Sequence, residues 1–181
     1  MPIPSAVLNT ITSDMHAVTV LTQSGCDTHA LALVFSSIDK MAWLTSANID
    51  HTRSDFIRWV DDYLLPAGSV SLNAIDLYAA RCGFLHTGSS ESKLFRDGKA
   101  KQIFYSVGPR KPQAELLTEV HSKLPKLGLT PDDVVVVQCI ELLEQWVAAM
   151  QRFTDAIKAD ASLEAHTKGR AELQLAVFPV A

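Results

Sequence analysis

Arg81 and His86 are the residues of this chain whose types and spacing are best suited to chemistry. They lie five positions apart in segment 75–91, which reads IDLYAARCGFLHTGSSE and passes from a helical pattern into a small polar loop. A guanidinium can hold a phosphate, and an imidazole can transfer a proton near neutral pH. The pair therefore predicts a phosphate-handling site at the end of a helix. The structural alternative is that Arg81 pairs with a surface carboxylate and a half-buried His86 caps the helix.

The helix that carries this pair does not by itself bring the two side chains together. At about 100° per residue, Arg81 and His86 would lie about 140° apart around an ideal helix. We expect them to converge only if the helix loosens near Gly83, if His86 swings back from the loop, or if a second chain supplies the partner. Cys82 falls on the predicted apolar stripe with Leu85, so we expect it to be a small buried hydrophobe.

The segment after this pair, 93–111, is the most basic part of the chain. Its single acid, Asp97, is outnumbered by six cations: Lys93, Arg96, Lys99, Lys101, Arg110 and Lys111. Phe95, Phe104 and Tyr105 lie among them. Cations interleaved with flat rings are typical of proteins that bind single-stranded nucleic acid by charge and stacking, although a solvated surface over buried rings has the same composition. We predict that Arg96, Lys99 and Lys101 contact phosphates at the rim of the site.

Composition limits the class of protein. The 181 residues are 48% hydrophobic and 20% charged, which is typical of one folded globular domain, here 1–181. The formal net charge of −4 argues against constitutive binding of duplex DNA. The sequence has no long apolar run and no signal-peptide pattern, so we expect a cytoplasmic protein with no membrane span. The three cysteines are far apart and the histidines lack H-x-x-x-H spacing, so we expect reduced thiols, no metal site and no cofactor.

Apolar residues at three- and four-residue steps predict that the chain is mostly helical. The expected helices are 6–22, 27–46, 54–65, 71–86, 112–124 and 131–159, the last being the longest. The fold class that follows is an all-α bundle of about five to six helices, with at most a minor two-stranded β accessory.

Two segments decide how much strand to expect. Valines at 134–137 have strand propensity, but the preceding residues, TPDD at 130–133, form a strong helix start. A cap, a proline at the first position and two acids near the positive end of the helix dipole favour a helix there. Segment 103–107 is a candidate strand, and segment 172–175 alternates briefly and is its expected partner.

The run DLYAARCGFLHTG at 76–88 resembles the motif region of HEPN domains, which are helical bundles with an Arg, four to six intervening residues and a His. Arg81 and His86 match that pattern, and segment 37–44, SIDKMAWL, resembles the preceding helix of such proteins. The resemblance covers about twenty residues. Catalytic members usually carry Asn, Asp or His directly after the Arg, where this chain has Cys82.

The resemblance implies a metal-independent endoribonuclease, with a role as a toxin or phage-defence component. RNA supplies its own nucleophile, the 2′-hydroxyl, so cleavage needs only proton transfer, here by His86, and stabilisation of the phosphate, here by Arg81. It also implies a homodimer with the motif helix at or near the interface. The alternative is a non-catalytic HEPN-like module that binds RNA, a nucleotide or a protein partner such as an antitoxin, and Cys82 favours this alternative.

Overall fold

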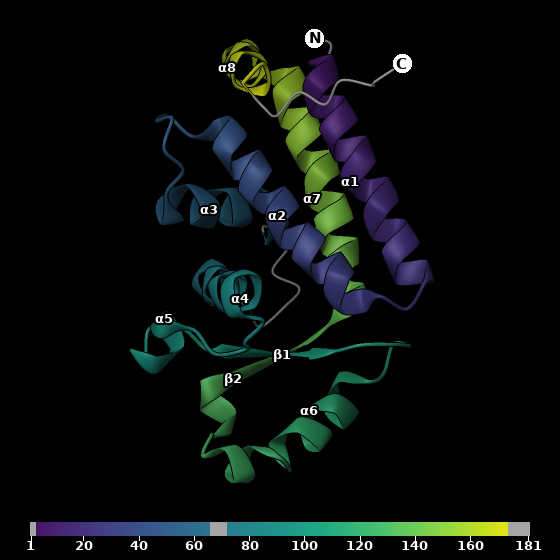
Figure 1. Cartoon of the computed structure of the whole chain (residues 1–181), viewed down its shortest axis with the longest axis vertical. Helices are drawn as coiled ribbons and strands as arrows, with labels where there is room; N and C mark the ends of the chain where they lie inside the picture. The colour runs from purple at the N-terminus through teal and green to yellow at the C-terminus, as the bar shows by residue number, and fades with distance from the viewer. Residues whose placement is uncertain (1–2, 66–71, 174–181) are drawn as a thin grey trace.

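Three long helices carry most of the hydrophobic core: α1 (Ser5–Gln23), α2 (Asp27–Thr45) and α7 (Cys139–Ala159). The computed structural model describes residues 3–65 and 72–173. Figure 1 shows these helices side by side, and α8 (Ala161–Ala171) packs against all three at one end. Phe35 of α2 and Trp146 and Phe153 of α7 are completely buried in this core. Large rings on both helices therefore hold the bundle together by burial.

Two shorter helical segments follow α2. α3 (Arg53–Trp59) continues as a π-helical turn, Val60–Leu64. Thr52 begins α3 with a capping box, in which its side chain accepts from the backbone N–H of Asp55 and the Asp55 side chain accepts from the backbone of Thr52. Burial alone would raise the pKa of Asp55, but hydrogen bonds from Thr52 and the charge of Arg58 lower it below its usual value.

α4 (Ala74–Thr87) is the motif helix, and it packs against α2, α3 and β1. The Asn73 side chain caps its start by accepting from the backbone N–H of Asp76, 3.1 Å away. Gly88, at φ 65°, ends it in the left-handed conformation that favours glycine. The helices predicted at 27–46 and 71–86 are confirmed as α2 and α4. Residue 71, where the latter was expected to begin, lies outside the described residues.

A two-stranded parallel sheet completes the described fold. β1 (Gln102–Ser106) pairs with β2 (Val134–Gln138), placing Ile103 opposite Val135. Ile103, Val135 and Val137 belong to the hydrophobic core. Because strand side chains alternate, Phe104 and Val136 face the other side, which α6 (Gln113–His121) covers (Figure 1). α5 (Lys93–Arg96) and two short 3₁₀ turns, Leu124–Leu127 and Pro131–Asp133, lie in the connections.

The prediction of one helix over 131–159 is wrong for residues 131–138. The capping box at Thr130 does form, with Asp133 as its partner, but it supports only the 3₁₀ turn Pro131–Asp133. Val134–Gln138 then forms β2, and all five of its residues are buried. β-branched side chains favour strands, and pairing with β1 buries the valines on both faces. The helix starts only at Cys139, and with 21 residues it is the longest in the described part of the chain, as predicted.

The strand predicted at 103–107 is confirmed as β1, but its expected partner is not. The partner is β2, far earlier in the chain than segment 172–175. Glu172 and Leu173 form a turn after α8, and residues 174–175 lie outside the described part. α8 itself was not predicted, since its sequence ASLEAHTKGRA has a weak apolar pattern and contains a glycine. Asp160 starts it by accepting from the backbone N–H groups of Ser162 and Leu163.

The helical fold class with a minor β part is confirmed. Helix, including the π-helical and 3₁₀ turns, makes up 70% of the structure, and the described residues contain eight α-helices instead of about five or six. The helix expected at 112–124 is α6, and the additional helices are α5 and α8, which are short and which hydrophobic periodicity detects poorly. Within residues 3–65 and 72–173, no helix combines the length and the hydropathy needed to cross a bilayer.

Candidate functional site

Arg81 is anchored to a neighbouring helix by Asp39 of α2. Its Nε and Nη2 both donate to Asp39 Oδ2, at 2.8 and 2.6 Å. The two side chains are only 19% and 18% exposed. Burial alone would lower the pKa of Arg81, but the hydrogen bonds and the negative charge of Asp39 raise it above its usual value. The guanidinium is therefore both charged and fixed in orientation.

The position of Arg81 follows from the buried face of α4. Ala74 and Leu77 are buried in the core, and Arg81 continues the same helix face at three- and four-residue steps. The expectation that Cys82 is a buried core residue is wrong, because it is half-buried and its Sγ lies 3.9 Å from Arg81 Nη1. Leu85, on the same predicted stripe, is also only half-buried. α4 packs on α2 and α3 as well as on β1, so its buried face differs from the apolar stripe seen in the sequence.

His86 reaches Arg81 without any break in the helix. Its Nε2 lies 3.5 Å from Arg81 Nη1, at the outer limit of a hydrogen bond. α4 continues as a helix to Thr87, so the expectation that the pair converges only through a loosened helix, a returning loop or a second chain is wrong. The long arginine side chain bridges the angular separation. His86 is exposed, and Gly88, not His86, caps the helix.

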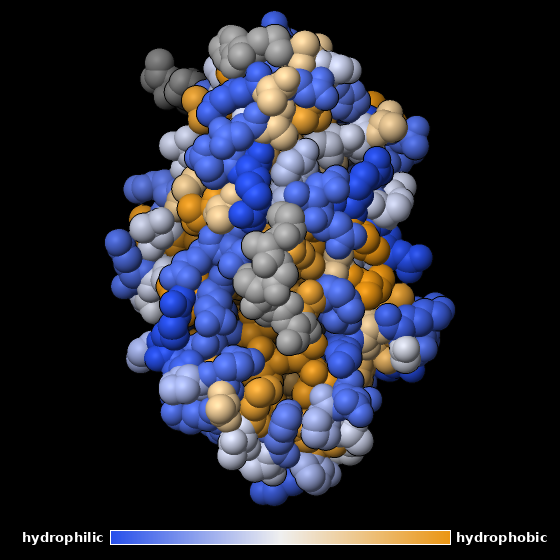
Figure 2. All heavy atoms as spheres, turned by 180° about the vertical axis from the view of Figure 1, so that it is seen from behind, coloured by the Kyte–Doolittle hydropathy of each residue, from blue (hydrophilic) through white to orange (hydrophobic). Residues whose placement is uncertain are grey.

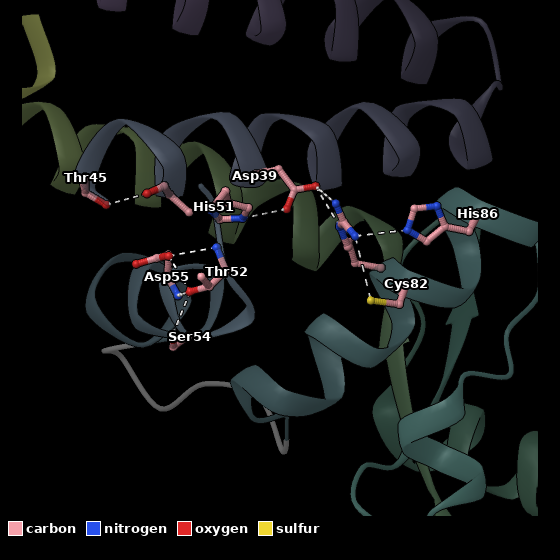
Figure 3. Close-up of polar contacts among 10 residues, drawn as sticks. Asp39, Thr45, His51, Thr52, Ser54, Asp55, Cys82 and His86 are labelled. Atoms are coloured by element: carbon pink, nitrogen blue, oxygen red, sulfur yellow. Dashed lines mark hydrogen bonds and ion pairs between the residues drawn. The ribbon is translucent and has the colours of Figure 1, made fainter. Parts of the chain in front are cut away.

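His51 adds a second imidazole on the far side of Asp39. Its Nε2 lies 3.4 Å from Asp39 Oδ1, the oxygen that Arg81 does not use. Both ring nitrogens are buried and neither makes a hydrogen bond within the described residues, so the 3.4 Å approach is a close contact and not an aligned hydrogen bond. Figure 3 shows Asp39 with His51 on one side and with Cys82 and His86 on the other. We call Asp39, His51, Arg81, Cys82 and His86 the Asp39 cluster.

Sequence reasoning did not identify Asp39 or His51 as site residues. Asp39 had a detectable signal, since it follows the core residue Phe35 by four positions and an isolated acid at that place indicates a buried partner. His51 had no such signal, because it lies in the loop between α2 and α3, where no periodicity applies.

The three cations predicted at the rim, Arg96, Lys99 and Lys101, are exposed, and each has an acidic residue as a neighbour. Arg96 lies 3.6 Å from Glu91, and Lys99 lies 4.0 Å from Asp97. The backbone N–H of Lys101 donates to the buried carboxylate of Asp76, at 2.7 Å, which ties β1 to α4. Within the described residues, none of the three makes a hydrogen bond or ion pair with Arg81 or His86. Their contact with a phosphate stays a prediction.

The other two cations at the end of the basic segment also face acids. Arg110 pairs with Glu144 at 2.5 Å, and Lys111 lies 3.3 Å from Glu115. The Tyr105 hydroxyl is buried, and the partly buried ring packs against the hydrophobic core. The excess of positive charge in the sequence is thus partly offset by acids that folding brings beside it.

A cavity lies elsewhere, in the half of the molecule that contains the sheet and α6. Figure 2 shows apolar side chains gathered on the rear face of that half. The cavity has a volume of about 180 Å³, and its lining includes Phe104 and Val136 of the sheet and Leu116 and Val120 of α6. None of the residues predicted for the site lines it.

Comparison of the chain with protein-family models, with curated proteins and with solved structures found no match. The described residues contain no group of three or more His, Cys, Asp or Glu side chains placed to hold a metal ion. The Asp39 cluster itself offers a fixed cation, a solvent-accessible imidazole beside it, and a half-buried carboxylate–imidazole pair behind them.

Proposed function

We propose that the chain is a metal-independent endoribonuclease of HEPN type. The observation that carries this proposal is the 3.5 Å separation of Arg81 Nη1 and His86 Nε2 at one helix end, with Arg81 anchored by Asp39. Asp39 occupies Nε and Nη2 of the guanidinium and leaves the Nη1 side toward His86. A phosphate placed there would meet a fixed positive charge and a proton-transfer group together.

The reaction needs only what RNA and these side chains supply. The 2′-hydroxyl oxygen attacks the neighbouring phosphorus, the bond to the 5′ oxygen breaks, and a 2′,3′-cyclic phosphate forms. His86 takes the proton from the 2′-hydroxyl or gives one to the departing 5′ oxygen, each a typical role for an imidazole. Arg81 stabilises the charge that develops on the phosphate. Arg96, Lys99 and Lys101 hold the adjoining phosphates, and a second copy of the chain supplies a second His86. A toxin or phage-defence role is the biological setting of this proposal.

The second candidate is a non-catalytic HEPN-like module that binds RNA, a nucleotide or a protein partner such as an antitoxin. Two observations favour it. Cys82 follows Arg81, where catalytic members of that family usually have a polar residue. Two of the three guanidinium nitrogens of Arg81 are also already engaged by Asp39, so the side chain also fits a purely structural ion pair between α2 and α4.

Cleavage of labelled RNA in the presence of EDTA tests the first candidate. We expect cleavage by the wild-type protein, and a loss of about 10²–10⁴-fold in His86→Ala, the usual range for general acid–base catalysis. Arg81→Ala should lose about 10²–10³-fold. His29→Ala is the matched control, since His29 is an exposed histidine on α2, and its cleavage should equal that of wild type.

Binding measurements separate the remaining outcomes. Lys99→Ala should weaken RNA binding and reduce the slope of log affinity against log salt by about 1. Salt-sensitive binding without cleavage supports the binding module. If the folded wild-type protein neither cuts nor binds RNA, Arg81 and His86 are a structural pair, and the ribonuclease proposal is wrong.

A further inference from the structure

α8 holds the loop 46–52, which connects α2 to α3 and carries His51. Arg170 Nη2 donates to the backbone carbonyl of Ser46, at 3.0 Å, and also to that of Asn48. His166 Nε2 donates to the same Ser46 carbonyl, at 2.9 Å. Two side chains on one face of α8 thus satisfy carbonyl groups of a loop that lies some 120 positions earlier in the chain.

Arg170 is a buried cation without an acidic partner in the described part of the chain. Arg170 as a whole is only 8% exposed. Besides the two carbonyls, its guanidinium lies over the ring of Trp43, 5.1 Å from the centroid. The Trp43 Nε1 in turn donates to the carbonyl of Ile49, at 2.9 Å. Burying a charge costs several kcal/mol. The contacts that offset this cost for Arg170 are the two loop carbonyls and the ring of Trp43, and Trp43 itself is hydrogen-bonded to the loop.

The other end of the loop is fixed separately. Thr52 caps α3, and its backbone N–H donates to Asp55 Oδ2 at 2.9 Å. His51 therefore lies between two fixed points, the clamped carbonyls at 46, 48 and 49 and the helix cap at 52. Its backbone is held on both sides, and its ring lies with Nε2 3.4 Å from Asp39 Oδ1.

We propose that Arg170 is a positioning residue for the Asp39 cluster. It fixes the loop 46–52 so that His51 stays against Asp39, and Asp39 in turn holds Arg81. Loss of the two donated hydrogen bonds lets the loop relax, and the His51 ring moves away from Asp39. The effect on cleavage rests on the proposed ribonuclease function, whereas the movement of His51 does not.

Three variants of the full chain test this role. Arg170→Met keeps an apolar stem and removes the donors. Arg170→Lys keeps a charged donor. Lys168→Met removes an exposed cation from the same helix and is the matched control. The readout is the position of the His51 ring resonances in NMR spectra, assigned with His51→Gln, measured beside thermal stability and RNA cleavage.

We expect Arg170→Met to displace the His51 ring resonances. Cleavage should fall by about tenfold to a hundredfold, because Asp39 then holds Arg81, the group that meets the phosphate, in a less exact position. Arg170→Lys should restore part of the wild-type position, and Lys168→Met should match wild type. A variant Arg170→Met that is less stable but has unmoved His51 resonances overturns the proposal, because Arg170 then only packs α8. If Arg170→Met does not fold, Arg170→Lys decides in the same way, by a smaller displacement or none. Displaced resonances in a protein that does not cut RNA would refute the ribonuclease function alone.

Discussion

Replacement of Asp39 by Asn is the most informative single change, because it removes the charge that anchors Arg81 and keeps the size of the side chain. Exposed ion pairs contribute about 0–1 kcal/mol, and breaking a fully buried pair costs about 3–5 kcal/mol. The Asp39 and Arg81 side chains are 18% and 19% exposed, so the expected cost lies between these ranges. The amide oxygen of Asn can still accept one of the two N–H groups, which keeps the cost near the lower end.

We therefore expect Asp39→Asn to lower the free energy of unfolding by about 2 kcal/mol, which corresponds to a fall in Tm of about 4–8 °C for a chain of this size. Urea unfolding followed by circular dichroism measures it, with an unchanged slope showing that the folded and unfolded states keep their compactness. A double-mutant cycle with Arg81→Met isolates the pair. Most of the loss should be absent when Arg81 is already replaced.

Two controls separate anchoring of Arg81 from general loss of charge. Asp14→Asn breaks another ion pair with a buried carboxylate, to the half-buried Lys40 at 2.6 Å, outside the site. It should cost stability but leave RNA cleavage unchanged. Glu119→Gln breaks the exposed pair with Lys123 and should change neither. If the urea midpoint of Asp39→Asn equals that of wild type, or if the cycle gives no coupling with Arg81, the anchoring described above is wrong.

Three further predictions concern other parts of the molecule. Because the pKa of Asp55 is lowered in the folded protein, its ionised form stabilises the fold above its unfolded pKa of about 3.9. Asp55→Asn should therefore lower the free energy of unfolding at pH 7, measured by urea unfolding, by about 0.5–2 kcal/mol. The difference from wild type should shrink as pH falls through the folded pKa. Burial raises the pKa of Cys139 to about 12, so a thiol reagent at pH 8, read out by peptide mapping, should label the half-buried Cys26 and Cys82 but not Cys139 until the protein unfolds. The Tyr105 hydroxyl is buried without a hydrogen-bond partner in the described residues, so Tyr105→Phe should leave Tm unchanged or raise it slightly.

The parts of the fold that could be predicted from sequence are those that local pattern controls. α2 and α4 follow from apolar spacing, and the start of α7 was misplaced for an instructive reason. The capping signal at Thr130 is genuine and the box forms, but the next residues are valines that bury themselves by pairing with β1. A parallel partner distant in the chain leaves no local trace, so local helix-start chemistry was given too much weight.

The site shows the same division. Arg81 and His86 were found because they belong to one helix, and their spacing is visible in the sequence. Asp39, His51 and Arg170 come from α2, a loop and α8, and only folding brings them together. The angle of 140° derived from an ideal helix describes only the directions in which the two side chains leave the backbone. The position of the guanidinium depends on the length of the arginine side chain and on its hydrogen bonds to Asp39.

This geometry changes the reason for expecting a dimer. A second chain is not needed to bring Arg81 and His86 together, since one chain places them 3.5 Å apart. Among the described residues, the Asp39 cluster offers a substrate only one imidazole, that of His86, because both ring nitrogens of His51 are buried. RNA cleavage moves one proton from the nucleophile and one to the leaving group. Within the proposed function, either His86 performs both transfers in turn or a second copy of the chain supplies the other imidazole. The need for a second imidazole, and not helix geometry, is thus the reason to expect a homodimer.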